Sequence, residues 1–219
     1  MSIKTVLFDL DGTLVDTAPD LADALNYTLS KNGFQELSLD DIRPHVSNGS
    51  IALIEFGFNI SSEEQNFKLY REQLLDFYTK NIANKSCLFS GFDNVLNAIE
   101  EKGLNWGIVT NKPSYLTDPL LKKLNLYNRA ATVVSSDTLE FRKPHPAPML
   151  YACKQAGSKP SECVFIGDAL RDIEAGRNAK MKTLIALFGY ISEQDDTETW
   201  NADGTINNAL DIIEWLNNN

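Results

Sequence analysis

The chain alternates short runs of consecutive apolar residues with amphipathic stretches, and this alternation constrains its fold more than any other feature. The apolar runs predict strands over residues 5–9, 105–110, 132–136, 163–168 and 182–187. Their apolar residues are successive rather than alternating, which is typical of strands buried on both faces of a parallel sheet. The intervening periodicity predicts helices over residues 92–102, 114–124, 148–156, 170–179 and 209–216. With right-handed crossovers, this order predicts an α/β fold with a Rossmann-like, doubly wound parallel sheet.

A long helical stretch follows the first strand and interrupts this rhythm. Residues 16–85 show helical periodicity and no strand pattern. Ser38 is predicted to begin one helix, and overlapping capping-box patterns at residues 61–65 precede a long amphipathic run. We therefore predict a catalytic core of residues 1–15 and 86–219, with residues 16–85 inserted as a helical cap domain over the carboxyl edge of the sheet.

Composition limits the partners of the chain. It has 30 acidic and 20 basic residues, a formal net charge of −10, whereas nucleic-acid modules carry a basic excess or a basic face. The three cysteines form no CxxC or Cys/His metal spacing, so reduced thiols are expected. The sequence shows no signal peptide and no apolar run long enough to span a membrane. We expect a soluble, cytoplasmic monomer or homodimer with no nucleic-acid or membrane partner.

Polar side chains follow the predicted strands, where parallel sheets bind their ligands. These residues are Asp9, Asp11, Thr110, Asn111, Lys143, Asp168 and Asp172. Clustered carboxylates repel one another unless a cation compensates them, and oxygen ligands without His or Cys favour Mg²⁺. A neighbouring lysine suits an anion, and phosphate can use both the metal and the ammonium group. The pattern therefore predicts phosphoryl transfer in which a carboxylate attacks.

The same residues lie in four ordered motifs. They are DLDGT (9–13), VTNKP (109–113), KPHP (143–146) and FIGDALRD (165–172). Together they resemble the motifs of the haloacid dehalogenase superfamily, and DxDGT after a buried strand is the most specific of them. VTNKP, KPHPAPML and LFGY (187–190) resemble the phosphoglycolate phosphatase-like subgroup.

The resemblance implies roles for the carboxylates. Asp9 would be the nucleophile that forms an aspartyl-phosphate, and Asp11 would act first as general acid and then as general base. Mg²⁺ would be held by the Asp9 carboxylate, the Asp11 backbone carbonyl and Asp168. Asp172 would lie close by or act through water.

The resemblance also implies a phosphate-binding set. Thr110, the Asn111 N–H and Lys143 would bind the transferred phosphoryl group. Gly12 would permit the turn at the substrate site that aims both aspartates inward, and Thr13 would steady that loop.

Other positions bear on specificity and on departures from the family pattern. The loop of residues 43–50 in the predicted cap (RPHVSNGS) is the best candidate for substrate discrimination. Within it, Arg43 is a candidate to meet a substrate carboxylate, with a solvated connector residue as the equal alternative. Ala169 stands where relatives often have Ser or Thr, so one supporting hydrogen bond is in doubt. Lys180 stands where relatives commonly have Gly, which is a stability cost if its backbone is left-handed.

The resulting prediction is a Mg²⁺-dependent phosphomonoester hydrolase acting on a small phosphorylated metabolite, with 2-phosphoglycolate as the leading candidate. Asp11 argues against dehalogenation, because a halide leaving group needs no proton, and Thr13 favours hydrolysis over phosphomutase chemistry. The alternatives are a sugar-phosphate phosphatase acting on a substrate such as N-acetylmuramic acid 6-phosphate, a pyrophosphatase, and a β-phosphoglucomutase-like phosphomutase. A non-catalytic binding protein would normally have lost Asp9, Asp11 or Asp168.

Overall fold

The core of the protein is a parallel sheet, seen in a computed structural model that describes residues 2–219. Its six strands have the spatial order β5-β4-β1-β6-β7-β8, and each neighbouring pair is parallel. The strands are β1 (Thr5–Phe8), β4 (Asn105–Val109), β5 (Thr132–Val134), β6 (Cys163–Gly167), β7 (Lys182–Ala186) and β8 (Gly204–Ile206). All residues of β1 and β6 are buried. The α/β fold predicted from their consecutive apolar residues is confirmed.

Helices cover both faces of this sheet. They are α5 (Phe92–Glu101), α6 (Ser114–Lys123), α7 (Ala147–Gln155), α8 (Leu170–Asn178) and α9 (Asp211–Asn218), with short 3-10 turns η2 (Pro160–Glu162) and η3 (Thr197–Trp200). The apolar residues of α5, α6 and α9 belong to one core cluster. Those of α7 pack with Ala175 of α8 in another. Two separate layers of apolar contacts on one sheet are typical of a doubly wound fold.

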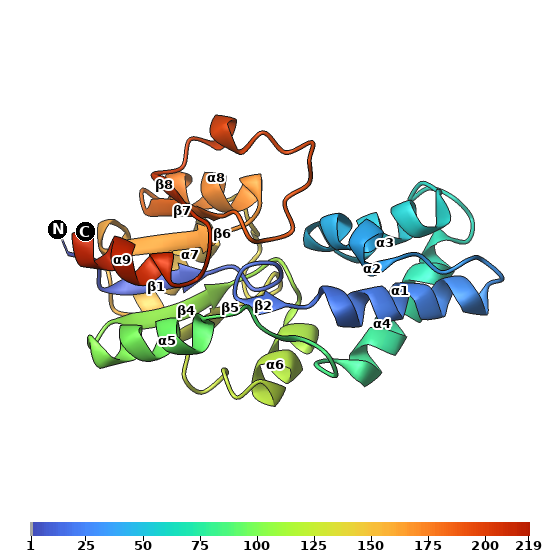
Figure 1. Cartoon of the computed structure of the whole chain (residues 1–219), viewed down its shortest axis with the longest axis horizontal. Helices are drawn as coiled ribbons and strands as arrows, with labels where there is room; N and C mark the ends of the chain where they lie inside the picture. Colours follow the sequence, from blue (N-terminus) through green and yellow to red (C-terminus); the bar gives the residue numbers. More distant parts are fainter. Residues whose placement is uncertain (1) are drawn as a thin grey trace.

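A helical insertion lies at one end of the molecule, beside the core (Figure 1). It comprises α1 (Ala18–Lys31), α2 (Leu39–Ile42), η1 (Arg43–Asn48), α3 (Gly49–Phe58) and α4 (Phe67–Asn81). Leu25, Leu53 and Leu74, on three different helices, are fully buried. The helices of the insertion therefore pack on one another, and their buried apolar residues are continuous with those of the core. The division at residues 16 and 85 stays a prediction.

Some local features differ from the sequence-based expectation. A two-stranded antiparallel ribbon, β2 (Val15–Asp16) and β3 (Cys87–Leu88), joins the two connections between core and insertion. Strands this short, and β8, have no detectable period, so they were not predicted. Ser38 caps α2 as predicted, accepting a hydrogen bond from the Asp41 N–H at 3.1 Å. The capping-box pattern at residues 61–65 instead forms turns, and α4 begins later, after Asn66.

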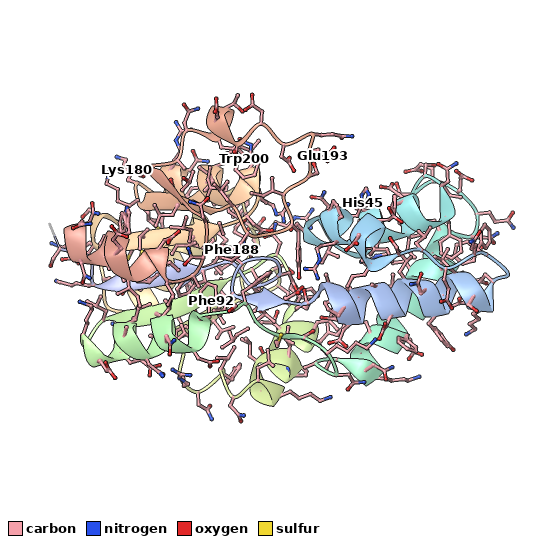
Figure 2. The ribbon with its side chains drawn as sticks, in the orientation of Figure 1. His45, Phe92, Lys180, Phe188, Glu193 and Trp200 are labelled. Atoms are coloured by element: carbon pink, nitrogen blue, oxygen red, sulfur yellow. The ribbon has the colours of Figure 1, made fainter. Side chains whose placement is uncertain are left out.

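The order of the strands identifies the edge of the sheet at which a ligand is expected to bind. From β1 the chain continues to β4 and β5 on one side, and it later returns to β6 on the other side of β1. The order therefore reverses at β1, and ligands of open α/β sheets bind beyond the carboxyl ends of the strands at such a point. Lys180 has a left-handed φ of 62° and lies at the far end of the core from the insertion (Figure 2). Its backbone strain therefore concerns stability and not the site.

Candidate active site

Three buried carboxylates meet beyond the ends of β1 and β6. One oxygen each from Asp9, Asp168 and Asp172 lies within 4.8 Å of the others. Asp9 follows β1, Asp168 follows β6, and Asp172 lies in the first turn of α8. The structure thus brings together residues that are more than 150 positions apart in the chain.

Lys143 lies against this carboxylate cluster. Its side chain is 1% exposed, and Nζ is 2.7 Å from Asp9 Oδ1 and 2.9 Å from Asp172 Oδ1. It also donates to the Val109 carbonyl at 2.7 Å. Burial works against the charged ammonium group, but Asp172 and Asp9 outweigh burial and raise the pKa of Lys143. Lys143 therefore remains a cation in the interior.

Burial also perturbs the carboxylates. It raises the pKa of Asp9 to about 6, an effect that Lys143 opposes and the charge of Asp172 reinforces. Burial raises the pKa of Asp168 to about 7, with Asp9 and Asp172 adding to it. These shifts show that one lysine does not fully compensate the three acids.

The cluster has the donor chemistry of a site for a hard cation. Among residues 2–219, Asp9 Oδ1 and Asp172 Oδ1 are buried without a directed hydrogen bond. Both oxygens are close to the Lys143 ammonium group, at 2.7 Å from Asp9 Oδ1 and 2.9 Å from Asp172 Oδ1. Asp168 is better held, accepting from Thr13 Oγ1 at 2.9 Å and from the Tyr190 N–H at 2.9 Å. Three carboxylates with unused lone pairs fit a divalent cation that prefers oxygen.

The carboxylate of Asp11 is separate from this cluster. Its Oδ1 accepts from Thr17 Oγ1 at 2.6 Å and from Lys112 Nζ at 2.9 Å. Lys112 was not selected as a site residue from the sequence, although VTNKP contains it. Its side chain is 6% exposed and that of Asp11 is 16% exposed, so this is a second ion pair at the same edge, and it is partly accessible.

The predicted phosphate-binding residues lie together around a cavity. Thr110, Asn111 and Lys143 all line it. The Asn111 side chain donates to the Lys143 carbonyl at 3.0 Å and accepts from the Lys143 N–H at 3.1 Å. The Asn111 amide thereby fixes the loop that carries Lys143. Thr110 Oγ1 accepts from the Lys112 N–H at 3.1 Å, which leaves the hydroxyl proton free to point elsewhere.

Gly12 and Thr13 lie behind the carboxylates. Gly12 has a φ of 85°, and a Cβ atom there would come 2.7 Å from Tyr190 Cδ2 and overlap Asp168. Only glycine fits this turn, because both the backbone angle and the space exclude a side chain. The hydroxyl of Thr13 holds Asp168 from the same loop.

Arg43 contacts a carboxylate outside the cavity. Its guanidinium is 2.9 Å from Asp16 Oδ1 and 5.5 Å from the centre of the Tyr190 ring. Within the described chain, it is not among the residues that line the cavity. The Arg43 guanidinium, which was a candidate to meet the substrate, is instead paired with Asp16 at the junction of core and insertion.

The cavity lies between the edge of the core and the insertion and has a volume of about 720 Å³. Its charged lining residues are Asp9, Asp11, Arg71, Lys112, Arg142, Lys143 and Arg171. Cations outnumber carboxylates in a chain of net charge −10, so the cavity can attract an anion although the whole protein repels it.

The insertion contributes residues of the predicted specificity loop 43–50 and one residue, Tyr78, that sequence reasoning did not select. Ser47, Asn48 and Tyr78 line the cavity from that side. Ser47 Oγ donates to Asp168 Oδ2 at 2.8 Å, and Arg171 of the core donates to the Ser47 carbonyl at 2.7 Å. These contacts connect the insertion to the carboxylate cluster. No sequence pattern predicts them, because they depend on how the insertion is seated.

Comparison with known proteins decides the family. Residues 6–186 match the family model of the haloacid dehalogenase-like hydrolases. The chain belongs to this family. It is 38% identical over 216 residues to an N-acetylmuramic acid 6-phosphate phosphatase of Pseudomonas aeruginosa, covering 99% of this chain and 96% of that protein. It is 42% identical over 200 residues to a phosphoglycolate phosphatase of Xylella fastidiosa, covering 91% and 87%.

A solved structure agrees with the fold. The crystal structure of a predicted phosphoglycolate phosphatase from Haemophilus somnus superposes with a TM-score of 0.86 at 27% identity, covering 98% of each chain. The haloacid dehalogenase-like fold and the resemblance to the phosphoglycolate phosphatase-like subgroup are therefore confirmed, and the chain is a phosphatase of this family. No helix among residues 2–219 has the length and apolar character needed to cross a bilayer.

Proposed function

We propose that this protein is a Mg²⁺-dependent phosphomonoester hydrolase that forms an aspartyl-phosphate on Asp9, with 2-phosphoglycolate as its leading substrate. One observation carries the proposal: Asp9 lines a cation-rich cavity and also belongs to a buried group of three carboxylates. A nucleophile needs access to the substrate, and a buried group of three carboxylates needs a cation that compensates its charge. Asp9 meets both requirements.

The chain's own residues account for both half-reactions. A carboxylate oxygen of Asp9 attacks phosphorus, the bond to the alcohol oxygen breaks, and Asp11, acting as general acid, gives a proton to that oxygen. Asp11 then takes a proton from a water molecule that attacks phosphorus. The bond between Asp9 and phosphorus breaks, and phosphate leaves. Thr110, the Asn111 N–H and Lys143 hold the phosphoryl oxygens throughout.

A bound Mg²⁺ would neutralise charge on the carboxylates and the phosphoryl group. The residues proposed to hold it are Asp9, the Asp11 backbone carbonyl and Asp168, with Asp172 beside them. The shared position of the three side chains and the two oxygens without directed hydrogen bonds support this assignment. Gly12 and Thr13 support the site from behind through Asp168.

A second substrate is favoured by the size of the cavity. About 720 Å³ is within the range for sugar-sized ligands and more than a two-carbon acid fills. One of the similar proteins is named for N-acetylmuramic acid 6-phosphate, so a sugar phosphate is our second candidate. We further propose that residues 16–85 act as a cap that excludes water during phosphoryl transfer.

The test is phosphate release from a panel of monoesters that includes 2-phosphoglycolate, N-acetylmuramic acid 6-phosphate and glucose 6-phosphate, each with Mg²⁺ and with EDTA. We expect Mg²⁺-dependent release and a preference for one of the two acids. Isomerised sugar phosphate without release of phosphate would instead indicate a mutase. No release from any ester would refute the proposed function.

A further inference from the structure

Two buried cysteines are in contact in the core, outside the candidate active site. Cys153 lies in the last turn of α7, and Cys163 is the first residue of β6. Both are buried free thiols, and their Sγ atoms are 3.2 Å apart. Because the sulfurs of a disulfide are about 2.05 Å apart, these two need to approach by only about 1 Å to be joined.

The hydrogen bonds around the pair distinguish the two sulfurs. The Cys163 thiol donates to the Lys159 carbonyl oxygen at 3.3 Å. Since a thiol has one proton, Cys153 is the donor in the contact between the sulfurs. This hydrogen bond from Cys153 lowers the pKa of Cys163 against the effect of burial, whereas the contact and burial together raise the pKa of Cys153. The thiolate is the reactive form of cysteine, so Cys163 is the nucleophile of the pair.

A short surface turn gives a small oxidant its route to the pair. Residues 156–162 connect α7 to β6, and Gly157, Lys159 and Ser161 in this turn are exposed. The Lys159 carbonyl that accepts from Cys163 belongs to the same turn. Exposed turns open locally at a small free-energy cost compared with global unfolding. Opening of this turn therefore uncovers the Cys163 sulfur while the rest of the core stays folded.

We propose that Cys153 and Cys163 form a modification site at which a small hydroperoxide, such as hydrogen peroxide, generates a disulfide. The Cys163 sulfur attacks one peroxide oxygen, the O–O bond breaks, and the other oxygen leaves with the Cys163 proton as water, so that Cys163 becomes a sulfenic acid. The Cys153 sulfur then attacks the Cys163 sulfur, the S–O bond breaks, and hydroxide leaves with the Cys153 proton as a second water. The two thiols lose two electrons, which reduce one peroxide. This inference does not depend on the proposed function.

The disulfide would stabilise the core without entering the active site. It would close a loop between positions ten residues apart, and closing a loop restricts the unfolded chain. For a chain of this length, the thermal unfolding midpoint is expected to rise by roughly 5–10 °C. The carboxylate cluster lies beyond the opposite end of β6, so phosphate release should be unchanged at temperatures where the reduced protein is folded.

The test treats the wild-type protein with hydrogen peroxide, removes the excess with catalase and blocks the remaining thiols after denaturation. Trypsin cleaves after Lys154, between the two cysteines, so a disulfide appears as two peptides that separate only on reduction. We expect two of the three thiols to be lost, the linked peptides to contain Cys153 and Cys163, and the unfolding midpoint to rise. Dithiothreitol should reverse all three changes.

Matched variants locate the effect. Cys87→Ala removes the exposed cysteine and should keep both the link and the rise in midpoint, whereas Cys153→Ala should lose both. The comparison of oxidised and reduced wild type stands even where Cys153→Ala folds poorly. Absence of the linked peptides, sulfinic acid on Cys163 in their place, or a linked protein whose midpoint does not rise would overturn the inference. These readouts do not involve phosphate release, so they leave the proposed function to its own test.

Discussion

Replacing Lys143 with Met tests whether charge compensation stabilises the carboxylate cluster. Met keeps a similar length and volume, so packing changes little while the charge disappears. Lys143 is buried, with Nζ 2.7 Å from Asp9 Oδ1 and 2.9 Å from Asp172 Oδ1. Removing one partner of a buried ion pair costs about 3–5 kcal/mol because the remaining charge is uncompensated. We expect a loss of this size in the free energy of unfolding at pH 8 in EDTA.

The loss should depend on pH in a defined direction. The pKa of Asp9 is about 6 even with Lys143 present, so below that pH Asp9 takes up a proton and needs less compensation. The effect of Lys143→Met should therefore be smaller at pH 5 than at pH 8. Urea unfolding at both pH values measures it, with Lys154→Met as control, since Lys154 is exposed on α7. Wild-type stability of Lys143→Met at pH 8, or an equal loss at both pH values, would refute the reasoning.

Other perturbations test other parts of the site. Mg²⁺ should raise the unfolding midpoint more at pH 8 than at pH 5, because Asp9 and Asp168, with pKa values raised to about 6 and about 7, must lose protons to bind it; an equal rise by thermal melting would contradict this. Gly189→Ala should destabilise the protein by about 1–3 kcal/mol and slow phosphate release, because its Cβ would lie 2.6 Å from the Gly12 carbonyl oxygen; wild-type melting would argue against it. Arg171→Met should raise KM severalfold while stability falls by only about 1 kcal/mol, because it removes the 2.7 Å hydrogen bond to Ser47 of the insertion. Steady-state kinetics would show an unchanged KM if that contact has no role.

The parts of the site that lie on buried strands could be predicted from the sequence. Consecutive apolar residues identified β1, β4 and β6, and parallel strands bring their carboxyl ends to one edge. Asp9 and Asp168 could therefore be placed at this edge, because Asp9 comes immediately after β1 and Asp168 immediately after β6. Asp172 belongs to the same group because the first turn of α8 returns it to the strand end.

Contacts that depend on the seating of the insertion could not be predicted. The Lys112–Tyr78 contact joins a core loop to α4, and the pairing of Arg43 with Asp16 joins η1 to the short ribbon. Neither residue pair has a periodic or motif signal, because each contact is fixed by how two packed bodies meet. Arg43 was a candidate to meet the substrate because it carries a positive charge in a loop between helices of the cap, and only the structure shows the acid beside it.

The most direct test of the account is to locate the covalent intermediate. The enzyme would be mixed with Mg²⁺ and substrate labelled in the phosphoryl group, quenched in acid and digested, and phosphate release by Asp9→Asn would be measured in parallel. We predict acid-stable label on the peptide that contains Asp9 and no turnover by Asp9→Asn. Label on any other residue, or substantial turnover by the variant, would contradict the central role of Asp9.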